Sequence, residues 1–509
     1  MEDTILLFIN GIHAVMSFKM IGWMLLGTAL GLLVGAIPGF TSSMATGLLL
    51  PMTFGMQSDV AMVFLISVYI AAIYGGSITA ILLNTPGTPE SSATSFDGYE
   101  LTQKGKGCEA MGIAFCASAI GGLISYTVMF FVMKPMAMLA LKFGPPEMFL
   151  IAVMGISVLA MLTTGSMAKT VAAGFFGLLL GTIGIVPTGE WRATFGSMFL
   201  AEGVQVVPAI IGFFAFSEIF DMVDRENVIR SSRNIVYSVR KIFSGMPMAL
   251  RHPLLLLKSA VIGIFIGAIP AAGASVAAFV SYGEAKRTAK HPEQFGQGAV
   301  EGVVAPESAN NASTGGALIT TLALGVPGSS TCAVLLGAMM IQGLHPGPQL
   351  LRDQLPMVYT IIAAAVISQL IMVVMAVLLG YSFTFLLKVS TKVLAPALIF
   401  FCIAGAYAVR NAAFDVYLMF AFGILGWFMK RQGYSLPAVV LGIVLGSIAD
   451  NELMRTYALY GSGTVTSFFT RPLSLIILAF MVLCLVHKIT SDRRIRKLRA
   501  TNRTQQGGV

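Results

Sequence analysis

Residues 60–89 carry no Asp, Glu, Lys or Arg, yet a polar turn interrupts this run. The run is long enough to enter a bilayer, but it contains Gly75-Gly76 and then Asn84-Thr85-Pro86-Gly87. A simple spanning helix needs about twenty apolar residues and has no use for such a turn. Non-helical backbone at membrane depth is tolerated only where protein buries it or where it lines a watery cavity. The interruption therefore predicts a binding site inside the membrane.

The same pattern occurs a second time in the chain. Gly315-Gly316 is followed by an apolar run, then by Pro327-Gly328 and a hydroxyl-rich segment. The glycine pairs are 240 residues apart and the Pro-Gly pairs are 241 residues apart. A third motif, GAIP at 35–38, recurs at 267–270. Three motifs repeated in one order predict two internal repeats, an arrangement common in transporters, with the binding site between them.

Composition places the chain among polytopic membrane proteins. Of its 509 residues, 56% are hydrophobic and 11% charged, and the mean hydropathy is +0.84. We expect an all-α fold of about 12 transmembrane helices in two internal repeats, with discontinuous or re-entrant helical hairpins. The five histidines form no ligand pair and the five cysteines show no CxxC spacing. We therefore expect free thiols and no transition-metal site.

Charge predicts the boundaries and the sidedness. The longest polar connection, 222–253, is rich in Arg and Lys, as is the tail at 489–509. The repeats would then be 1–221 and 254–471, followed by a last membrane helix at 472–488. The positive-inside rule predicts that the linker and the tail, and hence the C-terminus, are cytoplasmic. Inverted repeats each need an odd number of crossings, so a cytoplasmic linker would leave the end of the second repeat outside. The extra helix at 472–488 would return the C-terminus to the cytoplasm, and we favour this arrangement. The alternative is that the repeats are not inverted.

The two Pro-Gly breaks are the candidate substrate site. No Asp, Glu, Lys or Arg occurs in 259–283 or in 308–351, so a bound anion would rely on helix N-termini, backbone N–H groups and bound cations. The candidate substrate-binding residues are Asn84, Thr85, Pro86, Gly87, Thr88, Pro327, Gly328, Ser329, Ser330, Thr331, Asn310 and Asn311. The alternative is that Pro-Gly only kinks packed helices.

A second duplicated set could bind cations through freed carbonyl groups. Its members are Gly35, Pro38, Gly39, Ser42, Gly267, Pro270, Gly273 and Ser275, and the buried carboxylate of Glu307 joins them as an ion or proton site. Small residues can instead simply allow close helix packing. A glutamate in the first turn of a helix starting at Pro306 could merely complement the helix dipole. Glu90, Asp97 and Glu100 are expected at the membrane edge, solvated or at a partner interface.

Long segments of the chain resemble a known family. They are GLLVGAIPGF at 31–40, YGGSITAILLNTPGTPESSATSFDGYELTQKGKG at 74–107, GAIPAAGASVAAFVSYGEAK at 267–286 and APESANNASTGGALITTLALGVPGSSTCAVLLGAMMIQGLHPGP at 305–348. They are similar to the large membrane subunit of the tripartite tricarboxylate transporters, the TctA family. The chain departs from the family pattern at PAAGA (270–274) and at the TPESS that follows Pro86-Gly87.

The resemblance implies partners and an activity. Members work with a small four-helix membrane subunit and a periplasmic solute-binding protein, and they import carboxylates such as citrate on an ion gradient. For this chain we therefore expect the bacterial inner membrane, sodium as the coupling ion and no other cofactor, with a homodimer left open.

The predicted function is that of a permease subunit working by alternating access, and not that of an enzyme. No Walker GxxxxGK[ST] motif is present, so the chain is not expected to hydrolyse ATP. A membrane-embedded enzyme would need clustered acids, histidines or a nucleophile–base pair, and the breaks hold only Asn, Ser, Thr and Gly. A channel lined by the duplicated breaks is the other alternative.

Overall fold

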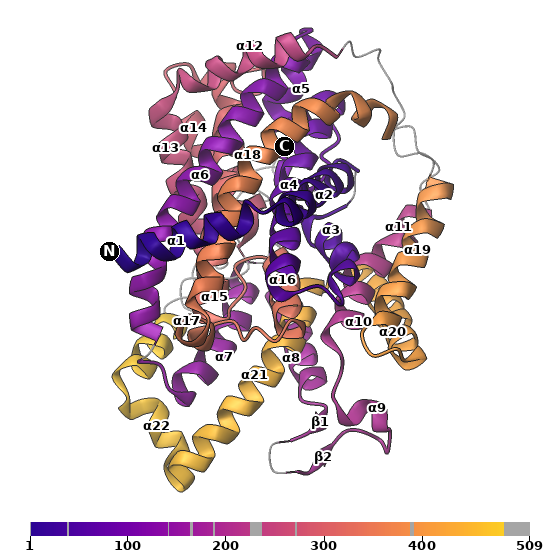
Figure 1. Ribbon diagram of the computed structural model, residues 1–509, viewed down its shortest axis with the longest axis vertical. Coiled ribbons are helices and arrows are strands. Elements are labelled where there is room, and N and C mark those ends of the chain that lie inside the picture. The colour runs from indigo at the N-terminus through magenta and orange to yellow at the C-terminus, as the bar shows by residue number, and fades with distance from the viewer. Residues whose placement is uncertain are drawn as a thin grey trace, which may run out of the picture. The chain divides into compact units, whose positions relative to one another are not determined.

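The structure, a computed structural model, describes residues 2–37, 40–140, 142–162, 166–186, 189–223, 237–269, 272–386 and 391–482 (Figure 1). Within these ranges the chain is almost entirely helical, and the only strands are β1 (Gly184–Ile185) and β2 (Trp191–Arg192), which pair antiparallel. The expected all-α class is therefore confirmed.

Two compact units make up the chain, and each contains parts of both halves of the sequence. Unit 1 comprises Met1–Lys142 and Val204–Gln432; unit 2 comprises Phe143–Gly203 and Gly433–Val509. In unit 2, α7 (Pro145–Leu162) and α8 (Met167–Gly181) pack on α21 (Leu436–Tyr460). The units therefore cross the boundary at 222–253 that charge suggested, because helices far apart in sequence pack together.

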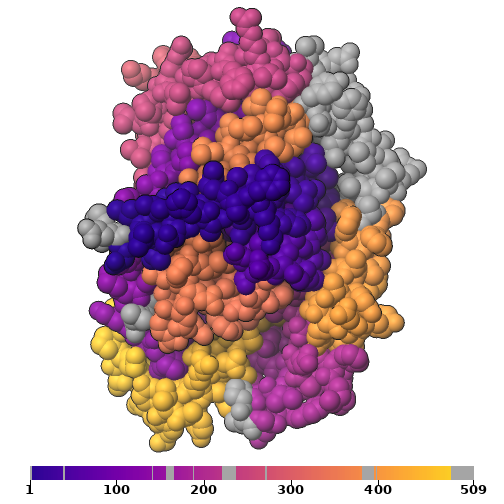
Figure 2. Space-filling model, in the orientation of Figure 1, coloured from indigo at the N-terminus to yellow at the C-terminus, as the bar shows by residue number. Residues whose placement is uncertain are grey.

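Unit 1 holds both interrupted segments. Its helices are α1 (Glu2–Val15), α2 (Phe18–Gly35), α3 (Ser42–Leu49), η1 (Leu50–Thr53), α4 (Ser58–Leu83), η2 (Pro89–Ser91), α5 (Ser95–Gln103), α6 (Gly107–Ala140), α10 (Val206–Ile210), the π-helix η3 (Ile211–Phe216), α11 (Ser217–Val223), α12 (Val239–Leu250), α13 (Pro253–Ala268), α14 (Gly273–Thr288), η4 (Pro292–Gln294), α15 (Glu301–Leu324), α16 (Ser330–Ile341), α17 (Pro348–Asp353), α18 (Leu355–Leu386), α19 (Thr391–Ala408) and α20 (Ala413–Arg431). Unit 2 adds α9 (Met198–Ala201), η5 (Gly461–Gly463) and α22 (Thr464–Thr470). Figure 2 shows α1 lying across one face of unit 1, where it packs on α18.

Two helix pairs in unit 1 repeat each other. Helix α2 packs on α4, and α13 packs on α15. A methyl group at Gly35 would overlap the backbone of Ala72, and one at Gly267 would overlap the backbone of Ser313. The helix backbones are thus in direct contact in both pairs, which is what small residues at a helix interface permit.

This packing fixes the register of the repeat. A methyl group at Gly75 would meet the Leu32 carbonyl oxygen at 2.5 Å, and one at Gly316 would overlap the carbonyl oxygen of Ile264. Gly75 therefore corresponds to Gly316, not to Gly315 as the paired glycines suggested. The offset between the second members of the two pairs, α4 and α15, is then 241 residues, the same as that between the Pro-Gly breaks.

The two long helices of the repeats run in opposite directions. Ser77, late in α4, donates a hydrogen bond to Glu307, early in α15 (2.6 Å). Tyr69, earlier in α4, lies 3.4 Å from Ser329, which follows the end of α15 (oxygen to oxygen). This antiparallel arrangement favours inverted repeats over parallel ones.

Six of the described helices are long and apolar enough to cross a membrane. They are Phe18–Gly35, Ser58–Leu83, Gly107–Leu139, Leu355–Gly380, Ala413–Arg431 and Leu436–Thr470. The pair α12–α13, which is bent by 84°, would be a seventh if its two helices formed one span, and shorter apolar helices accompany them. A polytopic membrane protein is thus confirmed, whereas a total of about twelve crossings stays a prediction.

Two predicted segments lie partly or wholly outside the described residues. The last membrane helix, 472–488, is described up to residue 482, and the tail at 489–509 lies beyond the described residues. In the linker, 224–236 lies outside them, while α12 is a helix packed on α6. In the part of the chain that the structure describes, Cys108, Cys116, Cys332 and Cys402 are not joined in disulfides.

Candidate functional site

The first break is a hairpin that folds back on its own helix. Helix α4 ends at Leu83, and Asn84 adopts the left-handed conformation (φ 55°). The chain then returns, so that the Gly87 N–H donates to the Gly76 carbonyl (3.1 Å). A methyl group at Gly87 would lie less than 3.0 Å from the carbonyl oxygen of Gly35 on α2. Only glycine allows this close approach of backbone to backbone.

The second break has the same construction 241 residues later. Helix α15 ends at Leu324, and Gly325 takes the left-handed conformation (φ 71°) at the position equivalent to Asn84. A methyl group at Gly328 would lie 2.5 Å from the carbonyl oxygen of Gly267 on α13. Ser329 then caps α16 by accepting a hydrogen bond from the Cys332 N–H (3.1 Å). The duplicated sequence pattern thus corresponds to duplicated hairpins.

The candidate substrate-binding residues at the hairpins differ in their exposure. Asn84 is exposed, and Thr85, Pro86, Ser329 and Ser330 are half-buried. The buried members are Gly87, Thr88, Pro327, Gly328 and Thr331. The structure therefore brings Thr88 and the second hairpin into the interior but leaves Asn84 at the outer end of α4.

A hydroxyl on α3 joins the two hairpins. The Ser42 Oγ lies 2.8 Å from the Thr331 Oγ1 and donates a hydrogen bond to the Glu90 Oε1 (2.8 Å). Glu90 and Thr331 occupy equivalent positions, because they too are 241 residues apart. Ser42, one of the candidate cation ligands, thus lies where the repeats meet.

Glu90 is the residue of this site that sequence reasoning missed. It was expected at the membrane edge, but it is half-buried, and its Oε2 atom is buried without a hydrogen-bond partner among the described residues. The reason is that η2 turns the chain back toward Gly76 rather than outward, which places Thr88 and Ser91 beside that glycine. The signal available in the sequence was the acid directly after a hydroxyl-rich break.

Glu307 forms the centre of a second polar cluster. Its side chain is fully buried and accepts hydrogen bonds from three hydroxyl groups, at 2.6 Å from Ser77, 2.5 Å from Thr94 and 2.7 Å from Ser118. Helix α15 begins at Glu301, so Glu307 lies inside the helix and not in a first turn starting at Pro306. The explanation as a dipole-complementing residue at a helix start is therefore wrong.

Asn310 and Asn311 are buried and incompletely hydrogen-bonded. Both amide atoms of Asn310, and the Nδ2 of Asn311, have no hydrogen-bond partner among the described residues. The Asn311 Oδ1 accepts a long hydrogen bond from Gln369 (3.4 Å). Leaving a buried polar group unpaired costs about 1–3 kcal/mol, so each such group calls for a partner such as a water, ion or ligand. Asn310 occupies the same repeat position as Tyr69.

The remaining candidate cation ligands separate into three groups. Gly35 and Gly267 pack against neighbouring helix backbone, in line with the close-packing alternative. Gly273 has φ 71° at the start of α14, and Ser275 is half-buried on the same helix. Pro38, Gly39 and Pro270 lie outside the described residues.

Asp97 is a buried anchor, which corrects its expected place at the membrane edge. Its Oδ1 accepts hydrogen bonds from three backbone N–H groups, of Gly296 (2.9 Å), Gly298 and Ala299 (both 2.8 Å). Its Oδ2 accepts one from the Tyr282 hydroxyl (2.9 Å). Asp97 thereby ties α5 of the first repeat to the loop that precedes α15 in the second.

Replacing Asp97 with alanine would leave these N–H groups without their acceptor. We expect a loss of about 1–3 kcal/mol of stability, the cost of an unpaired buried donor, because only Ala299 of the three N–H donors lies on a buried residue and water can reach the N–H of the exposed Gly296. The midpoint of thermal unfolding of the purified protein measures this loss. Glu100→Ala on the same helix is the control and should change the midpoint little, since Glu100 is half-exposed. Equal midpoints for the Asp97→Ala variant and the unmodified chain would contradict the assignment.

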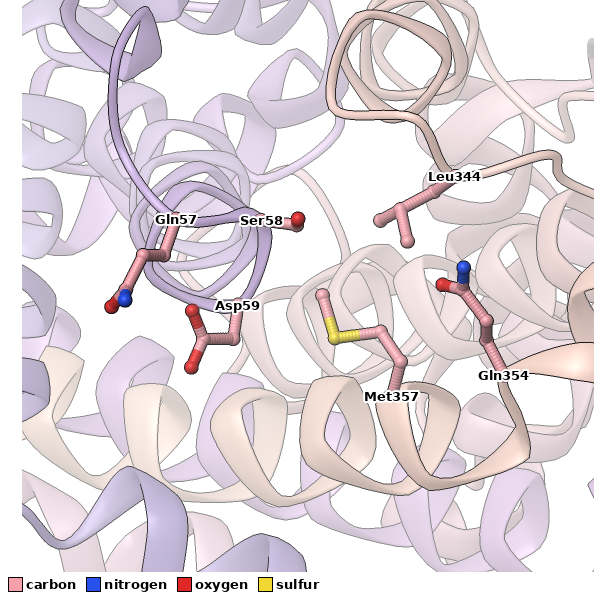
Figure 3. A pocket seen from close by; sticks show the side chains of 6 residues that line it. All are labelled: Gln57, Ser58, Asp59, Leu344, Gln354 and Met357. Atoms are coloured by element: carbon pink, nitrogen blue, oxygen red, sulfur yellow. The ribbon is translucent and has the colours of Figure 1, made fainter.

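The position equivalent to this anchor in the other repeat is open. Ala338 follows Asp97 by 241 residues and cannot accept such hydrogen bonds. At the N-terminus of α4, a pocket of about 390 Å³ is lined by Gln57, Ser58, Asp59, Leu344, Gln354 and Met357 (Figure 3). Gln57 precedes Gly298 by the repeat offset. The two repeats therefore differ at equivalent places. Hydrogen bonds to Asp97 close the contact at the start of α15, whereas a pocket lies at the start of α4.

Comparison with known proteins decides the family. The model of the tripartite tricarboxylate transporter TctA family matches residues 21–441. The chain belongs to this family. It is therefore a membrane subunit of the tricarboxylate transporter type, and the predicted family is confirmed.

Two relatives in Agrobacterium vitis match this TctA family member. An uncharacterised 52.8 kDa protein in the TAR-I ttuC' 3' region is 35% identical over 483 residues, covering 93% of this chain and 94% of the relative. An uncharacterised protein in the TAR-II ttuC' 3' region is 35% identical over 235 residues, covering 46% of this chain and 97% of the relative. No solved structure matches the chain.

Proposed function

We propose that the chain is the permease subunit of a secondary transporter that imports tricarboxylates or related carboxylates by ion-coupled alternating access. The observation that carries this proposal is the pair of equivalent hairpins joined through Ser42, which bonds the half-buried carboxylate of Glu90 in the first and the Thr331 hydroxyl in the second. Paired half-sites between inverted repeats are typical of secondary transporters, and the membership of the family agrees with this reading.

Charge balance supports coupling to a cation. Among the described residues, neither Glu90 nor Glu307 forms an ion pair, and both accept hydrogen bonds from hydroxyl groups. Bringing a di- or trianion to such a site without positive charge would be prohibitively unfavourable in a medium of low dielectric constant. Carboxylate, hydroxyl and carbonyl oxygens are ligands for hard cations. We propose that sodium ions bind at these carboxylates and offset the charge of the substrate.

The substrate carboxylates are proposed to lie between the hairpins. Thr88 and Ser329 are equivalent hydroxyl residues, and Ser329 opens α16, whose N-terminus carries partial positive charge. Asn310 and Asn311 would supply the amide donors that lack partners in the described structure.

The difference between the repeats supports alternating access. The Asp97 anchor fastens one junction, while the equivalent junction is open at the Gln57–Asp59 pocket (Figure 3). In an inverted repeat, exchanging these two arrangements would open one side of the site and close the other. A channel would need both junctions open at once.

The family name implies partner subunits. We propose that these are a small four-helix membrane subunit and a periplasmic solute-binding protein, and that the assembly resides in the bacterial inner membrane. The C-terminus and the linker that contains α12 are proposed to face the cytoplasm, since basic segments are retained on that side.

Uptake of radiolabelled citrate and a panel of other di- and tricarboxylates into proteoliposomes tests the proposal. The vesicles would contain the chain and the small membrane subunit, with the binding protein added outside. We expect uptake that saturates and that requires both the binding protein and an inward sodium gradient, with choline as the control cation. Flux that rises linearly with concentration, or that is equal in sodium and choline, would contradict a sodium-coupled transporter.

A further inference from the structure

Helix α12 has three distinct faces. Ile242, Gly245 and Ala249 are buried, and a methyl group at Gly245 would overlap the backbone of Glu109 on α6. A second face presents exposed apolar side chains, Val239, Phe243 and Leu250. At 100° per residue, a third face carries the exposed bases Arg240 and Lys241, and the exposed C-cap Arg251 continues the helical turn on the side of Arg240. A helix that is buried, apolar and basic on successive faces is typical of one lying in a membrane interface.

Helix α13, which follows α12, indicates how the protein is oriented in the membrane. Helix α13 turns 84° away from α12 after a break of two residues. Along α13, Leu254, Leu257, Val261 and Phe265 are exposed at helical spacing. Such an apolar stripe marks the side of α13 that faces lipid. Figure 1 shows α12 lying across the ends of α6 and α13. With the α13 stripe facing lipid, a helix nearly perpendicular to α13 would run parallel to the membrane surface.

The exposed bases of α12 and its C-cap have no partner of opposite charge among the residues that the structure describes. Arg240, Lys241 and Arg251 form no ion pair with any residue that the structure describes, and Lys106, one turn before the crossing with α6, forms none either. The neighbouring charges are already engaged, because Lys258 pairs with Glu284 (2.7 Å) and Glu301 lies 3.7 Å from His252. The acid nearest to the crossing is Glu109, whose backbone lies against Gly245.

We propose that α12 is a binding surface for anionic phospholipid, with Arg240, Lys241 and Arg251 holding the headgroup phosphates while Phe243 and Leu250 enter the acyl region. Charge complementarity selects the occupant. Bases with no ion-pair partner among the described residues, next to an exposed apolar edge, match an acidic headgroup and its acyl chains. Helix α6 also connects this surface to the cluster around Glu307. Helix α6 carries α12 at Gly112 and donates the Ser118 hydroxyl to Glu307, so a lipid that holds α12 in place also steadies this donor.

Lipid binding to the purified, delipidated full chain tests this proposal. Phosphatidylglycerol and phosphatidylcholine with identical acyl chains would be titrated separately and counted by native mass spectrometry. We expect tighter binding of phosphatidylglycerol, and a loss of that preference of roughly fivefold per base in the variant R240Q/K241Q/R251Q. Phe243→Ser should weaken both lipids alike, because it removes only apolar contact.

The control removes three bases that already have partners. Lys19 bonds Gln57 (3.2 Å), Arg352 pairs with Asp353 (2.7 Å) and Arg455 pairs with Glu452 (2.8 Å). The variant K19Q/R352Q/R455Q has the same change in net charge and should keep the preference for phosphatidylglycerol. Equal binding of the two lipids by the unmodified chain, or an equal loss in both triple variants, would overturn the proposal. The proposal would also be overturned if R240Q/K241Q/R251Q bound phosphatidylglycerol normally but lost a protein chain that co-purifies with the unmodified chain, because the surface would then bind a protein. Failure of the lipid proposal would not contradict the proposed sodium-driven uptake, which is measured in a separate assay.

Discussion

Replacing Glu307 with glutamine is expected to lower sodium-driven carboxylate uptake about tenfold to hundredfold. The Glu307 carboxylate is buried and accepts three hydroxyl hydrogen bonds, and hydrogen bonds to a charged group contribute about 1.5–3 kcal/mol each. Glutamine has nearly the same shape but carries no charge and offers an NH₂ group to one of the hydroxyls. If Glu307 binds the coupling cation, the variant should also need a higher sodium concentration for half-maximal uptake.

Two controls separate this effect from misfolding. Glu293→Gln makes the same change of charge at an exposed position on η4 and should leave uptake unchanged. The Glu307→Gln variant should appear in the membrane in normal amount and elute as one species after purification, because glutamine fills the same space. Normal uptake with an unaltered sodium dependence would show that Glu307 is only a packed polar residue.

Alanine at either hairpin glycine is expected to abolish transport and to reduce the stability of the protein. At Gly87 and Gly328 a methyl group would lie less than 3.0 Å from the carbonyl oxygens of Gly35 and Gly267. Overpacking of this kind typically costs about 1–3 kcal/mol, and here the obstacle is backbone, which cannot rotate away. Uptake and the midpoint of thermal unfolding should both fall in Gly87→Ala and in Gly328→Ala.

The matched controls are glycines with open space beside them. Gly22 on α2 and Gly283 on α14 have no atom within 4 Å of an added methyl group, so Gly22→Ala and Gly283→Ala should behave like the unmodified chain. Because the two hairpins are equivalent in the repeats, we also expect Gly87→Ala and Gly328→Ala to be impaired to a similar degree. Severe impairment in one variant with full activity in the other would contradict equivalent hairpins.

The sequence was informative about the hairpins because their chemistry is local. Pro86-Gly87 and Pro327-Gly328 show where each helix must break, and the hydroxyl residues around them show that the break is polar. The burial of Asn310 and Asn311 agrees with the absence of charged residues in 308–351, whereas the sequence left open whether Glu307 was buried or lay at an interface. The hydrogen-bond partners of Glu307 could not be predicted, because Ser77, Thr94 and Ser118 come from three different segments.

Glu90 and Asp97 show where sequence reasoning failed. Both are acids after a break, and acids usually lie in water, so a place at the membrane edge was expected. Glu90 instead meets Ser42 between the hairpins, and Asp97 is held by three backbone N–H groups. A break in a helix shows that the chain turns, but not which way it leaves. The two compact units are a different division from the predicted repeats, since they depend on packing such as that between α8 and α21, which lie far apart in sequence. The repeat bounds 1–221 and 254–471 stay a prediction.

The most direct test of the account compares the equivalent hydroxyls of the two hairpins in the uptake assay. Thr88→Ala and Ser329→Ala each remove one hydroxyl. Thr127→Ala removes an exposed hydroxyl whose partner among the described residues is the Leu123 carbonyl. If both hairpins hold the substrate, each hairpin variant should raise the KM for the carboxylate about two- to tenfold, the worth of one hydrogen bond, while Thr127→Ala leaves it unchanged. A normal KM in either hairpin variant would contradict a site shared between the repeats.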